Sequence, residues 1–170
     1  ESILDNGCSV KAQYYLQYIL NFNDNSTDIE TFHKWERISK VVSVIESGEY
    51  HDYLRSEGEK VVCYHSDIDD TLDYYTVTLP RGYCSNKKYP LLIINNVLHG
   101  DWLSSFFSRT KRIEVIAVDF NGKGITMGSY VGDTAFNEIY NDVFAKFSID
   151  ENKVLMIGHS NGGYAIWAQA

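Results

Sequence analysis

The sequence predicts an α/β domain with a mostly parallel sheet, which opens with an antiparallel hairpin and follows a helical segment. Before Gly58 apolar residues recur at helical spacing, whereas after it short apolar runs alternate with helical patterns. In addition, residues 91–94 and 154–157 are apolar at consecutive positions, which is typical of parallel strands covered on both faces. We therefore expect a helical segment over residues 1–58 and the α/β domain over residues 59–170.

The helical segment carries two apolar stripes and the pattern of a shorter helix. The first stripe follows Ser9, a good N-cap, and the second begins in the capping box at residues 27–30. The stripes comprise Val10, Tyr14, Tyr15, Tyr18, Ile19 and Phe22, and then Ile29, Phe32, Trp35, Ile38, Val42 and Ile45. The shorter helix holds Tyr50, Tyr53 and Leu54. Such stripes are typical of helices that pack in a core. We therefore expect this segment to pack through its apolar faces, and its sequence indicates no catalytic or binding function.

After Gly58 the expected elements alternate between strands and helices, which implies right-handed crossovers and a parallel sheet. We expect strands at residues 61–65, 74–79, 91–98, 112–120 and 151–158, and helices near 102–107, over 136–147 and from 161 onward. The first two strands flank a turn-rich stretch and are expected to form the hairpin. A glycine-rich loop, residues 122–132, is expected to lead into the second of these helices.

Composition and spacing exclude several classes of function. The net charge is −8, whereas a nucleic-acid partner needs clustered Lys and Arg, and no apolar stretch reaches the roughly 18 residues of a membrane span. Cys8, Cys63 and Cys84 lack the spacing of a metal site, so no metal is expected. The stretch NGKGITMG, residues 121–128, matches neither a dinucleotide fingerprint nor a phosphate loop, so no cofactor is expected. The sequence leaves the cellular compartment open.

A serine stands between the last expected strand and the last expected helix, in the sequence Gly158-His159-Ser160-Asn161-Gly162. This pattern in this setting is typical of a nucleophile elbow. Gly158 and Gly162 leave room for the sharp turn, and Gly163 is expected to let the helix approach the sheet. The serine is expected to hold strained backbone angles, at a cost of roughly 1–3 kcal/mol. The alternative, a glycine-rich turn with a surface serine, is disfavoured by the flanking elements.

From about residue 61 to residue 170 the chain resembles the first half of an α/β-hydrolase, in particular of esterases and prolyl-oligopeptidase-like peptidases. The segment YTVTLPRGYCSNKKYPLLI is similar to the first strands of that fold, and FSIDENKVLMIGHSNGGYA is similar to its helix, turn, strand and elbow. The resemblance implies that Ser160 is the acylated nucleophile. It also implies that the backbone N–H of Asn161 forms half of the oxyanion hole.

The second oxyanion donor is implied to lie in the loop after the strand at 91–98. The family places His-Gly at the end of this strand, and His99-Gly100 is present, but Asn95-Asn96 interrupts the apolar run first. Gly100, Asp101 and an N–H nearer Asn96 remain alternatives for this donor. One such donor is worth roughly 100- to 1,000-fold in rate.

The catalytic acid and base of this fold follow the nucleophile along the chain. All five histidines, His33, His51, His65, His99 and His159, precede or adjoin Ser160 without following it, and we interpret them as structural or surface residues. Asp119 and Asp133 are interpreted as loop and cap residues. We therefore expect the acid and base beyond residue 170, with the sheet truncated after the elbow. The expected partner is the remaining half of the hydrolase domain, as a continuation or a second chain.

The predicted function is a serine hydrolase that cleaves an ester or a peptide bond in a small substrate through an acyl-enzyme on Ser160. Residues 1–170 alone are expected to form neither a stable nor an active monomer. The alternative is a non-catalytic binding protein that keeps the fold, and a weaker one is a helical interaction segment on a scaffold sheet. An intact elbow disfavours the binding protein, because a binder has no need of a strained serine.

Overall fold

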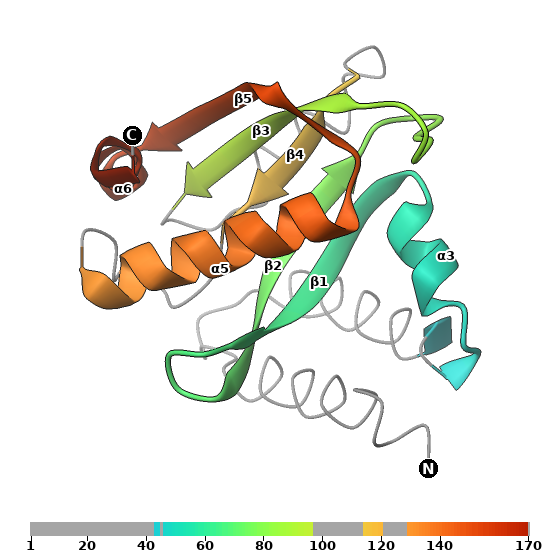
Figure 1. Cartoon of the computed structure of the whole chain (residues 1–170), viewed down its shortest axis with the longest axis horizontal. Coiled ribbons are helices and arrows are strands. Elements are labelled where there is room, and N and C mark those ends of the chain that lie inside the picture. Colours follow the sequence, from blue (N-terminus) through green and yellow to red (C-terminus); the bar gives the residue numbers. More distant parts are fainter. Residues whose placement is uncertain (1–42, 45, 97–113, 121–128, 170) are drawn as a thin grey trace, which may run out of the picture. The chain divides into compact units, whose positions relative to one another are not determined.

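The computed structural model describes residues 43–44, 46–96, 114–120 and 129–169 (Figure 1). The chain divides into two compact units, Glu1–Leu54 and Arg55–Ala170. All residues of the two predicted apolar stripes lie outside the described residues, as does the predicted helix near 102–107. Helix α3, Tyr50–Arg55, forms where the shorter helix was predicted. Asp52 in its first turn and Arg55 in its last turn both suit the helix dipole.

The second unit is built on a five-stranded sheet in the order β1-β2-β4-β3-β5 (Figure 1). The strands are β1 (Gly58–Ser66), β2 (Thr71–Leu79), β3 (Tyr89–Asn96), β4 (Ile116–Asp119) and β5 (Ile149–His159). β1 and β2 form an antiparallel hairpin, β2 pairs antiparallel with β4, and β3 pairs parallel with both β4 and β5. The predicted α/β class, with an N-terminal hairpin followed by parallel strands, is confirmed.

The apolar core runs through the middle of this sheet. Residues Leu91, Leu92, Ile93 and Ile94 of β3 are at most 5% exposed, and all four residues of β4 are buried. The prediction of strands covered on both faces is therefore right for β3. It is wrong for β5, where Leu155 is 61% exposed, because within the described residues β5 lies at the edge of the sheet.

Two helices of the second unit are described, α5 (Tyr130–Lys146) and α6 (Asn161–Gln169). α5 begins after Ser129, whose Oγ accepts a hydrogen bond from the N–H of Gly132 at 3.3 Å. Gly132 therefore lies in the first helical turn and not in the predicted loop, because the serine caps the helix upstream of it. Neither helix is long and apolar enough to cross a membrane, and the same holds for α3.

Asp119 also differs from its interpretation as a loop residue. It is the last residue of β4, lies opposite Thr76 and Ile94 in the ladders on either side, and is 3% exposed. The apolar run continues through Phe120, which is 4% exposed and stacks on Phe136 of α5 with ring centroids 4.8 Å apart. This contact fixes α5 against the end of β4, where the carboxyl ends of the parallel strands meet.

Candidate functional site

Ser160 is the single residue between the end of β5 at His159 and the start of α6 at Asn161. Its φ angle is 55°, in the left-handed region that costs a residue with a side chain roughly 1–3 kcal/mol. The N–H of Gly163 donates to the carbonyl oxygen of Ser160 at 2.9 Å, which closes the first turn of α6 directly on the serine. The strained strand-turn-helix geometry expected at this serine is thus confirmed.

Two glycines beside the serine are required by close packing. A Cβ on Gly158 would lie 2.3 Å from the carbonyl oxygen of Gly162, and a Cβ on Gly162 would lie 1.9 Å from that of Asn95. Real Cβ atoms essentially never come within 3.0 Å of such atoms. At Gly163 the nearest atom would be 3.7 Å away, an ordinary contact. The expectation that Gly163 is needed for close packing is therefore wrong, whereas Gly158 and Gly162 have no room for a side chain.

The serine lies beyond the carboxyl ends of the parallel strands, which is where ligand sites form in open α/β sheets. Ser160 and His159 are both exposed there. The β3–β5 register places Asn95 beside Gly158 and Asn96 beside His159, so the end of β3 flanks the elbow. The exposed hydroxyl of Ser160 therefore lies next to the carboxyl ends of two parallel strands, β3 and β5.

The start of α6 offers hydrogen-bond donors next to the hydroxyl. The first N–H groups of a helix have no partner within it, and together they form the positive end of the helix dipole. The backbone N–H of Asn161, the first residue of α6, belongs to this set. Gly100 and Asp101 lie outside the described residues, so their role stays a prediction. Asn96, the remaining alternative for the second donor, is the last residue of β3 and lies beside His159.

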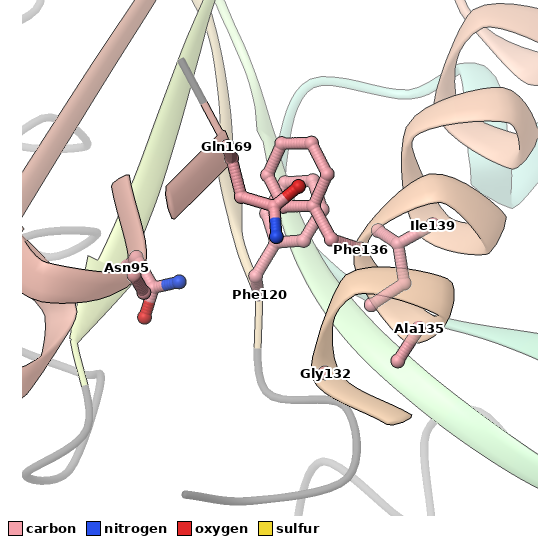
Figure 2. Close-up of a pocket in the computed structure, with 8 residues that line it drawn as sticks. Asn95, Phe120, Gly132, Ala135, Phe136, Ile139 and Gln169 are labelled. Atoms are coloured by element: carbon pink, nitrogen blue, oxygen red, sulfur yellow. The ribbon is translucent and has the colours of Figure 1, made fainter. Parts of the chain in front are cut away.

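A small pocket lies between the ends of β3 and β4 and the helices α5 and α6 (Figure 2). Its lining residues are Asn95, Phe120, Gly132, Ala135, Phe136, Ile139, Ala165 and Gln169. Gln169 of α6 donates from Nε2 to Oδ1 of Asp133 in the first turn of α5, at 2.5 Å, which joins the two helices. Asn95 is 2% exposed, and its Oδ1 has no hydrogen-bond partner in the described structure. Sequence reasoning missed this pocket, although a polar pair ending the apolar run of β3 was a signal.

None of the described histidines of the second unit is placed as a base for Ser160. His65 is on β1, at the opposite edge of the sheet from β5. Four strand spacings of about 4.8 Å separate these edges by roughly 19 Å, too far for a hydrogen bond. His159 directly precedes the serine on the strand. His51 belongs to the first unit, and His33 and His99 lie outside the described residues.

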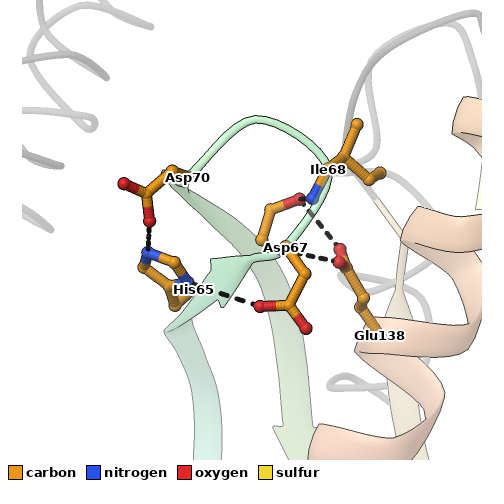
Figure 3. A network of polar contacts seen from close by, with 6 residues as sticks. His65, Asp67, Ile68, Asp70 and Glu138 are labelled. Atoms are coloured by element: carbon orange, nitrogen blue, oxygen red, sulfur yellow. Dashed lines mark hydrogen bonds and ion pairs between the residues drawn. The ribbon is translucent and has the colours of Figure 1, made fainter.

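His65 takes part instead in a polar network at the tip of the β1–β2 hairpin (Figure 3). Its Nε2 lies 2.8 Å from Oδ1 of Asp70, and its Nδ1 lies 3.8 Å from Oδ1 of Asp67. Glu138 of α5 accepts hydrogen bonds from the Ser66 hydroxyl at 2.9 Å and from the N–H of Asp67 at 2.8 Å. The carboxylate thus ties the hairpin tip to α5, a role that sequence reasoning missed.

The described ranges contain no group of three or more His, Cys, Asp or Glu side chains suited to a metal ion. The elements gathered at the elbow are an exposed hydroxyl and a helix N-terminus. This combination suits attack on an acyl carbon whose oxygen gains negative charge.

No family model and no curated protein sequence matches the chain. Among solved structures, it is similar to the fluorophosphonate-binding serine hydrolase F of Staphylococcus aureus, with a TM-score of 0.51 and 19% identity over 64% of this chain and 49% of that one. A thermostable esterase gives a TM-score of 0.51 and 14% identity over 68% of this chain and 38% of that one. A ferulic acid esterase of Anaeromyces mucronatus gives a TM-score of 0.46 and 22% identity over 63% of this chain and 51% of that one. The chain thus spans about half or less of the structures that it matches.

Proposed function

We propose that the chain, which has the α/β-hydrolase fold, is part of a serine hydrolase that cleaves an ester or a peptide bond with Ser160 as its nucleophile. The observation that carries the proposal is the positive φ of Ser160, 55°, between β5 and α6. A surface serine gains nothing from this conformation, which costs roughly 1–3 kcal/mol. In a hydrolase, the same conformation presents the hydroxyl above the strand ends, next to the free N–H groups of a helix.

The proposed reaction proceeds through an acyl-enzyme. The hydroxyl oxygen of Ser160 attacks the acyl carbon while a base removes the hydroxyl proton, and the carbonyl oxygen becomes an oxyanion. The N–H of Asn161 donates to this oxyanion, with a second N–H from the end of β3 or the loop that follows it. The oxyanion collapses and expels the alcohol or amine, which takes the proton from the base. Water then attacks the ester on Ser160 and releases the acid.

A serine hydroxyl without a base is a weak nucleophile at neutral pH. We place the catalytic histidine and its acid in sequence that follows residue 170, in the same polypeptide or in a second one. The distance of about 19 Å between the sheet edges at His65 and at Ser160 supports this placement.

The remaining half of the hydrolase domain is the proposed partner of the free edge of β5. This strand has eleven residues and a row of backbone groups that no described strand pairs on its outer side. On β5 itself Leu155 is 61% exposed, and on α6, which follows it, Tyr164 is 79% exposed and Trp167 is 85% exposed. An open strand edge with exposed apolar side chains favours pairing with a further strand.

A fluorophosphonate probe on the full-length protein tests the proposed nucleophile. We expect covalent labelling of Ser160, identified by peptide mass spectrometry, and loss of labelling in Ser160→Ala. Labelling that persists in this variant, or a protein that never labels, would instead favour a binding protein that kept the fold. Parallel assays with small acyl esters and with short peptides then separate an esterase from a peptidase.

A further inference from the structure

The side chain of Asn95 is a buried polar group at the end of an apolar strand. The preceding residues of β3, Leu91 to Ile94, are all apolar and buried, and Asn95 continues the strand at 2% exposed. Its Oδ1 is buried without a hydrogen-bond partner. A buried acceptor left unpaired loses its bonds to water and gains nothing in return, whereas leucine has nearly the same shape and no such cost. No described residue supplies a donor to this oxygen, and Asn95 lines the small pocket.

Asn95 lies against the elbow on both sides of the serine. It is opposite Gly158 in the β3–β5 ladder, and its backbone carbonyl lies against Cα of Gly162 at the start of α6. Any group bound at its side chain is therefore held close to the proposed nucleophile. Asn95 lines the pocket, and Figure 2 shows its amide nitrogen on the side of Gln169 and the two phenylalanine rings, with Oδ1 turned away from them.

The other walls of the pocket limit what it can bind. Phe120, Phe136, Ala135 and Ile139 contribute apolar surface, and Gln169 already donates to Asp133. The space is small, and Oδ1 of Asn95 is an acceptor that needs a donor. This combination suits a small group with one hydroxyl or N–H, and it excludes a long apolar chain.

We propose that Asn95 is a substrate-binding residue, whose Oδ1 accepts a hydrogen bond from a small hydroxyl or N–H group of the substrate. This inference rests on the proposed hydrolase function. The preferred substrates are then esters or amides that carry a hydroxyl or amino group close to the scissile bond. An apolar analogue of the same size is rejected because it leaves the buried oxygen unpaired.

Two pairs of esters test the proposal on the full-length protein. One pair compares a hydroxyacetyl ester with a propionyl ester, and the other compares a 2-hydroxyethyl ester with a propyl ester, so that a methyl replaces the hydroxyl on either side of the scissile bond. We expect kcat/KM to favour the hydroxylated member of one pair by about tenfold, the size of one neutral hydrogen bond. The pair that shows the preference identifies the side of the substrate that enters the pocket.

The key variant is Asn95→Leu, and its matched control is Thr78→Val. The hydroxyl of Thr78 on β2 is likewise buried without a hydrogen-bond partner, but Thr78 does not line the pocket. Both variants are expected to raise the melting temperature, because each removes an unpaired buried group. Only Asn95→Leu is expected to abolish the preference for the hydroxylated ester. Asn95→Ala, which adds no bulk, is also expected to abolish the preference for the hydroxylated ester. It replaces Asn95→Leu in the test if the leucine variant does not fold.

The outcomes separate this inference from the function on which it rests. If neither member of either pair is hydrolysed and Ser160 takes no fluorophosphonate label, the proposed function fails and this inference falls with it. If esters are hydrolysed but the preference is absent, or survives in Asn95→Leu and Asn95→Ala, only the role of Asn95 is overturned. A fall in melting temperature for Asn95→Leu would point to a bound water as the permanent partner of the amide and would also overturn it.

Discussion

Gly162 at the start of α6 lies with its Cα against the backbone carbonyl of Asn95, so close that a Cβ would be 1.9 Å from the oxygen. This contact sets how near the helix comes to β3. Because Ser160 is joined directly to α6, the same contact sets where its hydroxyl stands above the strand ends. The geometry of the elbow therefore depends on packing between two strands and a helix as well as on the local turn.

Substitution of Gly162 is the most direct test of this packing. We expect Gly162→Ala to lower the free energy of unfolding by about 1–3 kcal/mol, because the new methyl group must push α6 away from β3. The matched control is Gly163→Ala, whose Cβ meets nothing nearer than 3.7 Å and whose helix propensity improves. Denaturant unfolding of the full-length protein measures both. Equal unfolding curves for the two variants would contradict the packing described for the elbow.

The strain at Ser160 predicts opposite effects on stability and activity. Ser160→Gly is expected to raise the free energy of unfolding by about 1 kcal/mol, since glycine adopts a φ of 55° without strain. Ser160→Ala keeps the strained backbone and is expected to leave stability nearly unchanged. Both variants are expected to abolish ester turnover. A glycine variant no more stable than the alanine variant would argue against strain, and turnover in either would remove the serine from the proposed mechanism.

Disruption of the polar network at the hairpin tip is expected to lower the stability of the protein and to leave its catalytic activity unchanged. Glu138→Ala leaves the Ser66 hydroxyl and the N–H of Asp67 without their carboxylate and is expected to cost about 1–3 kcal/mol of unfolding free energy. The exposed Glu151 on β5 is the control, with an expected change within about 0.5 kcal/mol for Glu151→Ala. At temperatures where both variants are folded, kcat/KM is expected to match the unsubstituted protein. A specific loss of turnover in Glu138→Ala would mean that the hairpin tip contributes to the site.

The exposed apolar residues of β5 and α6 predict how residues 1–170 behave when expressed alone. We expect residues 1–170 to self-associate and to lack esterase activity, because the outer edge of β5, which no described strand pairs, and Leu155, Tyr164 and Trp167 remain uncovered. Sedimentation velocity measures the association. Leu155→Lys together with Trp167→Glu is expected to reduce it, whereas Tyr130→Glu, at an 82% exposed position on α5, is the control. A folded monomer that hydrolyses esters by itself would contradict the proposed partner and the placement of the acid and base.

The local sequence was sufficient to predict the elbow but not the residues that surround it. The apolar run into Gly158, the two flanking glycines and the helical pattern after Asn161 predict the strand, turn and helix, because each depends on neighbouring residues. Asp119 falls inside the strand predicted at residues 112–120, and only its separate interpretation as a loop residue was wrong, because a charged residue rarely ends a buried strand.

The pocket and the hairpin network could not be predicted for a related reason. The pocket brings Asn95 together with Phe120, Phe136 and Gln169, and the network brings Glu138 to Ser66, across long stretches of sequence. Such contacts follow from strand order and from the rotation of α5 and α6 about their axes. A single sequence carries no signal for either until the sheet is assembled.

The register of the parallel pairing between β3 and β5 also decides whether α6 can dock on the sheet. A slip of one residue would place Ile94 opposite Gly158 and turn the side chain of Asn95 to the other face of the sheet. The start of α6 would then no longer find the carbonyl group against which Gly162 fits. A chain with misaligned strands therefore cannot dock this helix correctly, so the serine reaches its strained conformation only in molecules whose sheet is paired in register.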